Sequence, residues 1–267
     1  MNLSFKQLNN LGGWLTFGIA LFTYVSTLEP TVSFWDCGEY IATSVKLQVG
    51  HPPGAPVFQL IANVLSQLAL GDVERQAFYV NLASGLSSAF TIPFLFWTIV
   101  AFGRKLFSVD TLSRGQEIVL LGAGAVGALA FTFSDSFWFS AVEGEVYAMS
   151  SCFTAIAFWA VLKWEAAVDE DPYANRWLLL IAYLTGLSVG IHILVFLTIP
   201  SVVMIYFYKK FPNVTWKSWV VANAASIGVL ALVFAIIIPF ILSLFGWLEI
   251  TAVNSIGLPK NSGSLFA

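Results

Sequence analysis

Residues 218–246 read SWVVANAASIGVLALVFAIIIPFILSLFG and contain no charged side chain. A helix needs about 20 apolar residues to cross the hydrocarbon core of a bilayer, so this stretch is long enough to span a membrane. Similar apolar stretches occur near 11–28, 78–102, 117–134 and 147–164. Of the 267 residues, 58% are hydrophobic and only 10% are charged, whereas soluble proteins are roughly a quarter charged. The sequence therefore predicts an all-α, polytopic integral membrane protein.

Two further apolar stretches decide the topology. The stretch at 177–208 is too long for one span, because such a helix would run roughly 48 Å against a hydrocarbon core of about 30 Å. Gly190 and His192 lie where an outer turn would divide it into two short spans. The stretch at 57–70 is short, and it suits a surface or re-entrant helix better than a crossing. These assignments predict about seven transmembrane helices, a cytoplasmic N-terminus and a long outer first loop at 29–77.

The basic residues support this orientation, because cytoplasmic loops of membrane proteins carry an excess of lysine and arginine. If 57–70 lies on the outer side, only three basic residues lie outside, namely Lys46, Arg75 and Lys260. The other nine face the cytoplasm: Lys6, Arg104, Lys105, Arg114, Lys163, Arg176, Lys209, Lys210 and Lys217. In a bacterium this places the protein in the inner membrane with a periplasmic outer face, and in a eukaryote in the ER membrane.

The first outer loop carries the polar motifs that suggest chemistry. Asp36 and Glu39 lie three residues apart, so a helical turn would aim both carboxylates the same way. Further on, His51 precedes Pro52-Pro53-Gly54, and paired prolines hold the chain rigidly. A carboxylate that is partly desolvated binds protons more tightly, as a general base requires. The alternatives are a structural hydrogen bond or helix cap for the acids and a helix-entry hydrogen bond for His51, which could otherwise contact a phosphate oxygen or orient a carboxylate.

Later outer segments add four candidate substrate-binding residues, namely Glu143, Glu145, Tyr147 and His192. The two acids precede a predicted span, and acidic residues at that position also complement the helix dipole. Capping therefore remains an alternative to substrate binding for both. His192, in the predicted outer turn, is similarly open to a structural role.

Several function classes lack support in the sequence. The net charge of −3 argues against nucleic acid as a partner, and no nucleotide-binding or metal-spaced motif is present. No cofactor is predicted. Asp36 and Glu39 could hold a divalent ion, but two carboxylates alone are weak evidence for one. Cys37 and Cys152 are expected to be free thiols rather than a disulfide framework. The predicted spans hold almost no ionisable residues, which argues against coupled transport.

These motifs resemble those of the multi-spanning GT-C glycosyltransferases. More narrowly, the chain is similar to a bacterial branch of formerly unknown function whose eukaryotic relatives are protein O-mannosyltransferases. The matching residues are Asp36, Gly38, Glu39, Gly50, His51, Pro52, Pro53, Gly54, Glu145, Val146, Tyr147, Gly190 and His192. The sequence departs from the pattern at Ala55, where an aromatic residue is expected, and in having fewer spans than such enzymes. The resemblance makes 1–267 a single transmembrane domain, the N-terminal GT-C module of a larger enzyme.

The resemblance implies inverting transfer of a sugar, such as mannose, from a polyprenyl-phosphate carrier to a protein or glycan hydroxyl on the outer membrane face. Asp36 is then the expected general base, Glu39 its partner in positioning the acceptor or the sugar, and His51 the group near the phosphate. The expected partners are membrane lipids, the lipid-linked donor and the acceptor. Two other readings remain open: a multi-spanning transporter or lipid flippase, and a non-catalytic membrane subunit.

Overall fold

The structure is a computed structural model that describes residues 3–107 and 111–266. Over these residues it is helical and has no β-strand, which confirms the predicted all-α class. The chain divides into two compact units, Met1–Thr198 and Ile199–Ala267. The motif residues of the outer loops all belong to the first unit.

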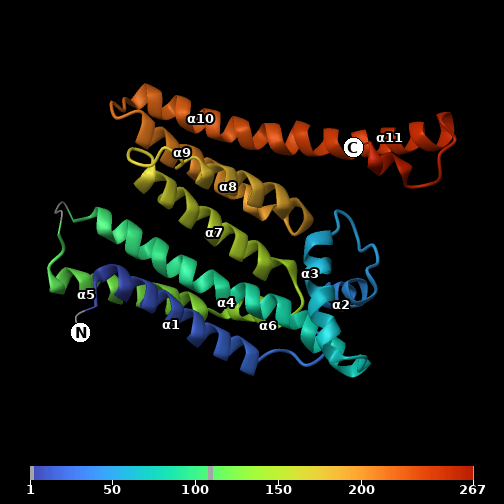
Figure 1. Cartoon of the computed structure of the whole chain (residues 1–267), viewed down its shortest axis with the longest axis horizontal. Coiled ribbons are helices and arrows are strands. Elements are labelled where there is room, and N and C mark those ends of the chain that lie inside the picture. Colours follow the sequence, from blue (N-terminus) through green and yellow to red (C-terminus); the bar gives the residue numbers. More distant parts are fainter. Residues whose placement is uncertain (1–2, 108–110, 267) are drawn as a thin grey trace. The chain divides into compact units, whose positions relative to one another are not determined.

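The first unit combines long helices with short ones (Figure 1). The long helices are α1 (Phe5–Ser26), α4 (Val73–Lys105), α5 (Arg114–Thr132) and α7 (Val146–Ala167). The short helices are α2 (Cys37–Lys46), α3 (Pro56–Ser66), α6 (Asp135–Val142) and α8 (Arg176–Leu187), with 3-10 turns at Gln67–Ala69, Ser188–Gly190 and Ile193–Thr198. The segment at 135–146, predicted as a loop, thus contains the helix α6.

Side-chain caps explain where three of the long helices begin. Ser4 forms a capping box with Gln7 at the start of α1, and Ser113 forms the same arrangement with Gln116 at the start of α5. Asp72 caps α4 by accepting a hydrogen bond from the backbone of Glu74. Each cap satisfies backbone N–H groups that the first turn of a helix leaves without partners.

Helix α4 lies at the centre of the first unit and packs against α1, α5 and α7. Tyr24 of α1 and Phe96 of α4 are almost completely buried in the shared core. The Tyr24 hydroxyl donates a hydrogen bond to the carbonyl of Thr132, at the end of α5, over 3.0 Å. Burial of large side chains with their polar tips bonded stabilises this bundle.

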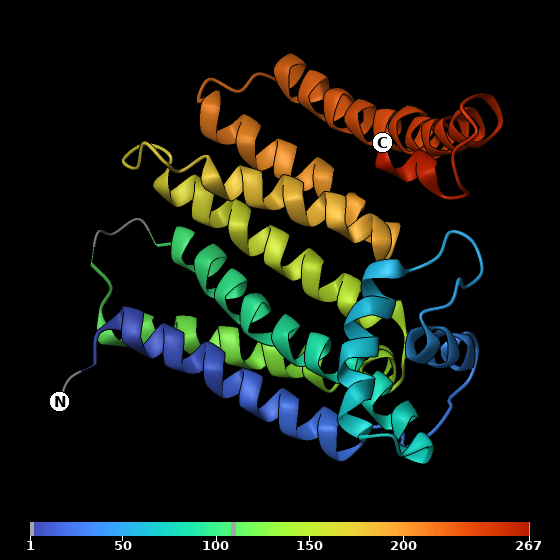
Figure 2. The same cartoon turned by 45° about the vertical axis from the view of Figure 1, so that its right-hand side comes forward.

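Helices α2 and α3 lie across the end of the bundle that is opposite the start of α1 (Figures 1 and 2). Phe58 of α3 is fully buried against Ile41 of α2 and Val80 of α4. The Asn63 amide donates hydrogen bonds to the carbonyls of Ser44 and Val45, 2.8 and 3.1 Å away, and so ties α3 to the end of α2. The segment between α1 and α4, predicted to be an outer loop, is therefore packed onto one end of the bundle.

The second unit consists of α9 (Ile199–Lys210), α10 (Trp216–Leu232) and α11 (Ile238–Ile250), with π-helical turns at Val233–Ile237 and Thr251–Ser255 and a 3-10 turn at Ser262–Leu265. Its last turn is held by Glu249, whose carboxylate accepts hydrogen bonds from the backbone N–H groups of Asn261 and Gly263 at 2.6 and 2.8 Å.

Among the described residues, five helices are long and apolar enough to cross a membrane: Val73–Lys105, Arg114–Thr132, Val146–Ala167, Ile193–Lys210 and Trp216–Ser255. Helix α1 is 22 residues long but carries Asn9 and Asn10, and it is not among the five. Pro56–Ala69 and Arg176–Gly190 are shorter apolar helices. Several potential spans are thus present, while seven spans and a re-entrant helix stay predictions.

Candidate functional site

The Asp36 motif begins helix α2. Asp36 precedes the first residue of the helix and Glu39 lies in its first turn. The helix ends at Leu47, which has a left-handed backbone with φ 47°. The chain then turns back through a loop that places His51 beside the helix start, and Gly54 supplies the positive φ of 80° that leads into α3. Two motifs separated in sequence therefore meet at one place.

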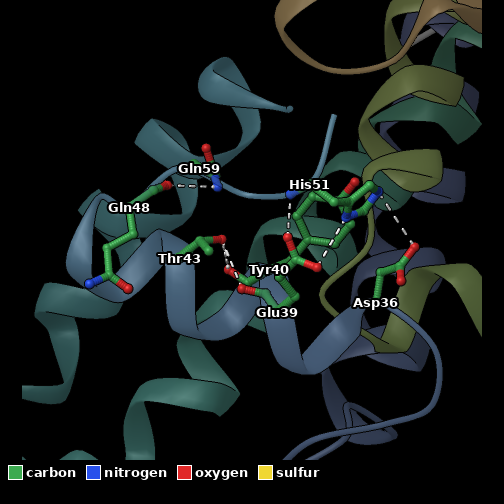
Figure 3. A network of polar contacts seen from close by, with 7 residues as sticks. All are labelled: Asp36, Glu39, Tyr40, Thr43, Gln48, His51 and Gln59. Atoms are coloured by element: carbon green, nitrogen blue, oxygen red, sulfur yellow. Dashed lines mark hydrogen bonds and ion pairs between the residues drawn. The ribbon is translucent and has the colours of Figure 1, made fainter. Parts of the chain in front are cut away.

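Glu39 and His51 are joined by two hydrogen bonds (Figure 3). Glu39 Oε1 accepts from the backbone N–H of His51 at 2.5 Å, and Glu39 Oε2 lies 3.0 Å from His51 Nδ1. The bond from the His51 backbone, followed by that from the ring, lowers the pKa of Glu39. The side-chain bond to Glu39 raises the pKa of His51. Since both Glu39 oxygens contact His51, Glu39 is placed to orient that ring. Its predicted role in positioning the sugar or the acceptor stays a prediction.

Asp36 lies on the other side of the same ring. Figure 3 shows the His51 ring between Glu39 and Asp36, with His51 Nε2 3.9 Å from Asp36 Oδ2. The Asp36 side chain is 57% exposed, so its carboxylate can reach a ligand. The ring thus has one carboxylate bonded to it and a second one within ion-pairing distance, which favours the charged imidazolium.

A small cavity of about 150 Å³ opens beside this cluster. It is lined by residues of α2, of the loop before α3, of the start of α7 and of the turn after α8: Asp36, Tyr40, His51, Pro53, Gly54, Glu145, Val146, Tyr147, Val189, Ile191, His192 and Ile193. The structure therefore brings together Asp36, His51, Glu145, Tyr147 and His192, five of the seven residues that the sequence singled out. Glu39 acts on the cavity through His51.

Glu145 is a buried carboxylate on the cavity wall, only 5% exposed. Its backbone is fixed by Ser84 of α4, whose hydroxyl donates to the Glu145 carbonyl at 3.0 Å and accepts from the Glu145 N–H at 3.2 Å. Burial, and next the charge of Glu143, raises the pKa of Glu145 to about 7. This carboxyl group is therefore poised to exchange a proton near neutral pH.

The His192 ring packs against the Tyr147 ring on the cavity wall, with the ring centroids 5.1 Å apart. Its Nδ1 accepts a hydrogen bond from the backbone N–H of Leu194 at 3.2 Å, so the neutral ring carries its proton on Nε2. Burial lowers the pKa of His192, which keeps this ring neutral. His192 is thus a neutral hydrogen-bond donor, whereas the contacts of His51 with Glu39 and Asp36 favour its charged form.

Glu143 does not line the cavity. It is 4% exposed, its Oε2 has no hydrogen-bond partner among the described residues, and it lies beside Ser33 and Glu29 of the first loop. Burial raises its pKa, and the charge of Glu29 adds to the effect. The prediction that Glu143 contacts substrate is not supported by this placement, because the side chain turns back beneath the first loop.

Three contributors escaped the sequence reasoning: Tyr40, Ser84 and Asn81. Tyr40 lines the cavity, and burial raises its pKa to about 12. Asn81 is completely buried and donates hydrogen bonds to the carbonyls of Glu29 and Thr31, 2.8 and 2.9 Å away. A polar side chain within a predicted span, as at Asn81 and Ser84, was the available signal, because such groups are costly unless bonded.

Asp36, Glu39 and His51 also form a group that could hold a cation, since one ligand atom from each lies within 4.8 Å of the others. Oxygen and imidazole nitrogen are common ligands of divalent metals. Binding through His51 Nδ1 would require its hydrogen bond to Glu39 to break. The arrangement described is accounted for by the hydrogen bonds alone.

Fold and site together define a helical membrane protein with an acid and histidine cavity at one end of its bundle. Residues 36–215 match the family model described as "Protein O-mannosyl-transferase TMEM260 N-terminal domain", and the matched segment starts at Asp36. The chain belongs to this family of O-mannosyltransferase-related membrane glycosyltransferases.

Two curated relatives give the extent of the similarity. "Protein O-mannosyl-transferase tmem260" of Dictyostelium discoideum is 27% identical over 186 residues, which are 66% of this chain and 21% of the relative. "Protein O-mannosyl-transferase TMEM260" of Mus musculus is 29% identical over 161 residues, 58% of this chain and 20% of the relative. The match thus spans about a fifth of each relative. No solved structure matches the chain.

Proposed function

We propose that the chain provides the base-bearing part of a glycosyltransferase that moves mannose from a polyprenyl-phosphate carrier to a protein hydroxyl. The observation that carries this proposal is the meeting of Asp36, Glu39 and His51 beside a cavity that also holds Glu145 and His192. The relatives are named as protein O-mannosyl-transferases, which suggests the sugar and the acceptor class. A glycan hydroxyl is the alternative acceptor.

In the proposed reaction Asp36 acts as general base. Its carboxylate takes the proton from the acceptor hydroxyl while the hydroxyl oxygen attacks the anomeric carbon of the sugar. The bond from that carbon to the phosphate oxygen breaks, and the polyprenyl phosphate leaves with the electron pair, so the configuration inverts. Phosphate is a good leaving group, so the step needs donors to the departing anion more than a strong general acid.

The imidazoles are the proposed donors to that phosphate. His51 carries positive charge because Glu39 raises its pKa, and its Nε2 faces the Asp36 side of the cavity. Neutral His192 can donate from Nε2, since its Nδ1 is occupied by the Leu194 backbone. Charge-assisted and neutral hydrogen bonds to an anion would then come from opposite walls.

A second cavity supports a lipid-linked donor. This cavity, of about 450 Å³, is lined mostly by apolar surface from α4, α5, α7 and the turn Ile193–Thr198. On α7 it involves Ser150, Ser151 and Thr154, the turns that directly follow Tyr147 of the smaller cavity. A prenyl chain in the larger cavity would place its phosphate toward His192. We place this face on the outer side of the membrane, following the distribution of basic residues.

Transfer of labelled mannose from polyprenyl-phosphate mannose to an acceptor protein in proteoliposomes tests the proposal. Asp36→Asn should lower kcat/KM by at least about 100-fold, the usual contribution of a general base. Asp135→Asn is the matched control, because Asp135 is exposed at the start of α6 and does not line the cavity. Full activity of Asp36→Asn, or equal loss in both variants, would remove Asp36 as the base.

A further inference from the structure

A third cavity lies at the other end of the first unit, away from the Asp36 cluster. It measures about 260 Å³ and lies between α1, α4 and α7. Along α7, Lys163 on its wall is 16 residues beyond Tyr147 of the candidate site, which corresponds to about 24 Å at 1.5 Å per residue. Nothing in the proposed transfer reaction uses this cavity.

The cavity combines positive charge with aromatic walls. Arg104 of α4 and Lys163 of α7 line it, together with Trp97 and Trp159. The ammonium of Lys163 lies 5.3 Å from the centre of the Trp159 ring, a cation–π contact that holds it at the wall. The residues that line the cavity, among those described, include no aspartate or glutamate. The site therefore favours an anion.

Lys163 has no acidic partner within the part of the chain that the structure describes, unlike three other basic residues. Three other basic residues at this end pair with carboxylates: Lys105 with Glu165, Arg114 with Glu117, and Arg176 with Asp171. Within the described residues, no carboxylate lies within ion-pairing distance of Lys163. The ammonium of Lys163 is therefore available to pair with an anionic ligand.

Asn9 of α1 contributes a second unsatisfied group. Its Oδ1 atom is buried and has no hydrogen-bond partner among the described residues, while its backbone carbonyl accepts from the indole of Trp97 at 3.1 Å. Asn10 lines the same wall. A buried amide oxygen without a partner costs free energy that a hydroxyl donor on a ligand would recover. The ligand therefore combines an anionic group with hydroxyls.

We propose that this cavity binds the phosphate head group of an anionic phospholipid, such as the phosphoglycerol of phosphatidylglycerol. The cations would contact the phosphate, and the Asn9 amide oxygen would accept from a glycerol hydroxyl. Basic pockets between transmembrane helices at the membrane surface are suited to such head groups. The tryptophan rings would flank the interfacial part of the lipid.

Native mass spectrometry of the purified chain in an equimolar mixture of phosphatidylglycerol and phosphatidylcholine tests this site. The unmodified chain should retain more phosphatidylglycerol. Lys163→Gln should reduce the preference about fivefold, the effect of removing roughly one cationic contact. Lys217→Gln removes the same charge from an exposed lysine that also contacts a tryptophan ring but does not line the cavity, so it should leave the preference unchanged. Asn9→Asp keeps the side-chain shape but adds a repelling charge, so it should lower the preference further.

Equal retention of the two lipids by the unmodified chain, or an equal loss in Lys163→Gln and Lys217→Gln, would overturn the proposal. Millimolar inorganic phosphate added as competitor separates a lipid site from a phosphate site. Weak competition is expected, and complete displacement of the lipid would overturn the assignment to a head group. Since the readout is lipid binding, the result does not depend on whether Asp36 is the base.

Discussion

Substituting Glu145 by glutamine is expected to stabilise the chain, and to do so increasingly as the pH rises. Glu145 is buried at the cavity wall, where its pKa is raised to about 7 from 4.5. The folded chain therefore binds a proton that the unfolded chain has lost between these pH values. Stability contributed by the protonated acid is complete below about pH 4.5 and is lost as the pH rises through about 7. Glutamine has nearly the same shape and never ionises.

The size of the effect follows from the two pKa values. Each tenfold change in proton affinity corresponds to about 1.4 kcal/mol, so moving the pKa of Glu145 from 4.5 to about 7 corresponds to about 3 kcal/mol. The difference between Glu145→Gln and the unmodified chain should stay under about 1 kcal/mol at pH 5 and approach about 3 kcal/mol at pH 8. At pH 8 this is a rise in Tm of roughly 6–12 °C.

The chain contains its own reporters for the measurement. Its two cysteines, Cys37 and Cys152, are free thiols buried in the first unit. Reaction of these thiols with 4,4′-dithiodipyridine, which proceeds at acid as well as neutral pH, would therefore report thermal unfolding in detergent at pH 5 and pH 8. Glu170→Gln, at an exposed glutamate of the turn after α7, makes the same chemical change outside the cavity and should leave Tm unaltered.

A stabilisation of equal size at both pH values would refute the reasoning, because a proton-linked effect must grow with pH. A loss of stability at pH 8 would refute it more strongly. That outcome would mean that the ionised Glu145 makes a favourable contact in the folded chain.

Three further predictions concern the supports of the site. Glu39→Gln should lower the pKa of His51 toward its ordinary value, because the side-chain bond that raises it is weakened; NMR titration of the two histidine rings would measure this, and an unchanged value would contradict it. Gly190→Ala would place a Cβ 2.6 Å from Val57 Cγ2, so it should cost about 1–3 kcal/mol from overpacking; Val57→Ala should restore part of that stability, and additive losses would speak against the contact. Asn81→Leu strands two backbone carbonyls of the first loop, at about 1–3 kcal/mol each; a Tm within 1 °C of the unmodified chain, on the order of the error of such a scan, would show that water replaces the amide.

The sequence was informative about structural features that depend on the geometry of residues close together in the chain. A spacing of three residues in a helical turn placed Asp36 and Glu39 at the start of α2, and the prolines after His51 predicted a fixed corner that the structure places beside them. Hydrophobic length predicted the helical class. The interruption near Gly190 also occurs, as α8 gives way to short 3-10 turns there.

The sequence was less informative about the positions of side chains that depend on burial and on contacts between distant parts of the chain. Glu143 and Glu145 are two residues apart, and only the packing of the loop onto α4 shows that one faces the cavity and the other turns away. Nor did the sequence show that both oxygens of Glu39 would contact His51. The Asn81 side chain bonds to the carbonyls of Glu29 and Thr31, about 50 positions earlier in the chain, and the spacing of residues in the sequence cannot reveal such a distant contact.

Helix α7 contributes to each of the three cavities described above, through Tyr147, then Ser150 and Thr154, and finally Lys163. A helix moves as a stiff rod, because every turn is hydrogen-bonded to the next. A shift or rotation of α7 would change the shapes of the three cavities together. A lipid wedged at its far end would therefore restrain the acid and imidazole groups at its near end, and the membrane composition could in this way set how rigidly those groups are held.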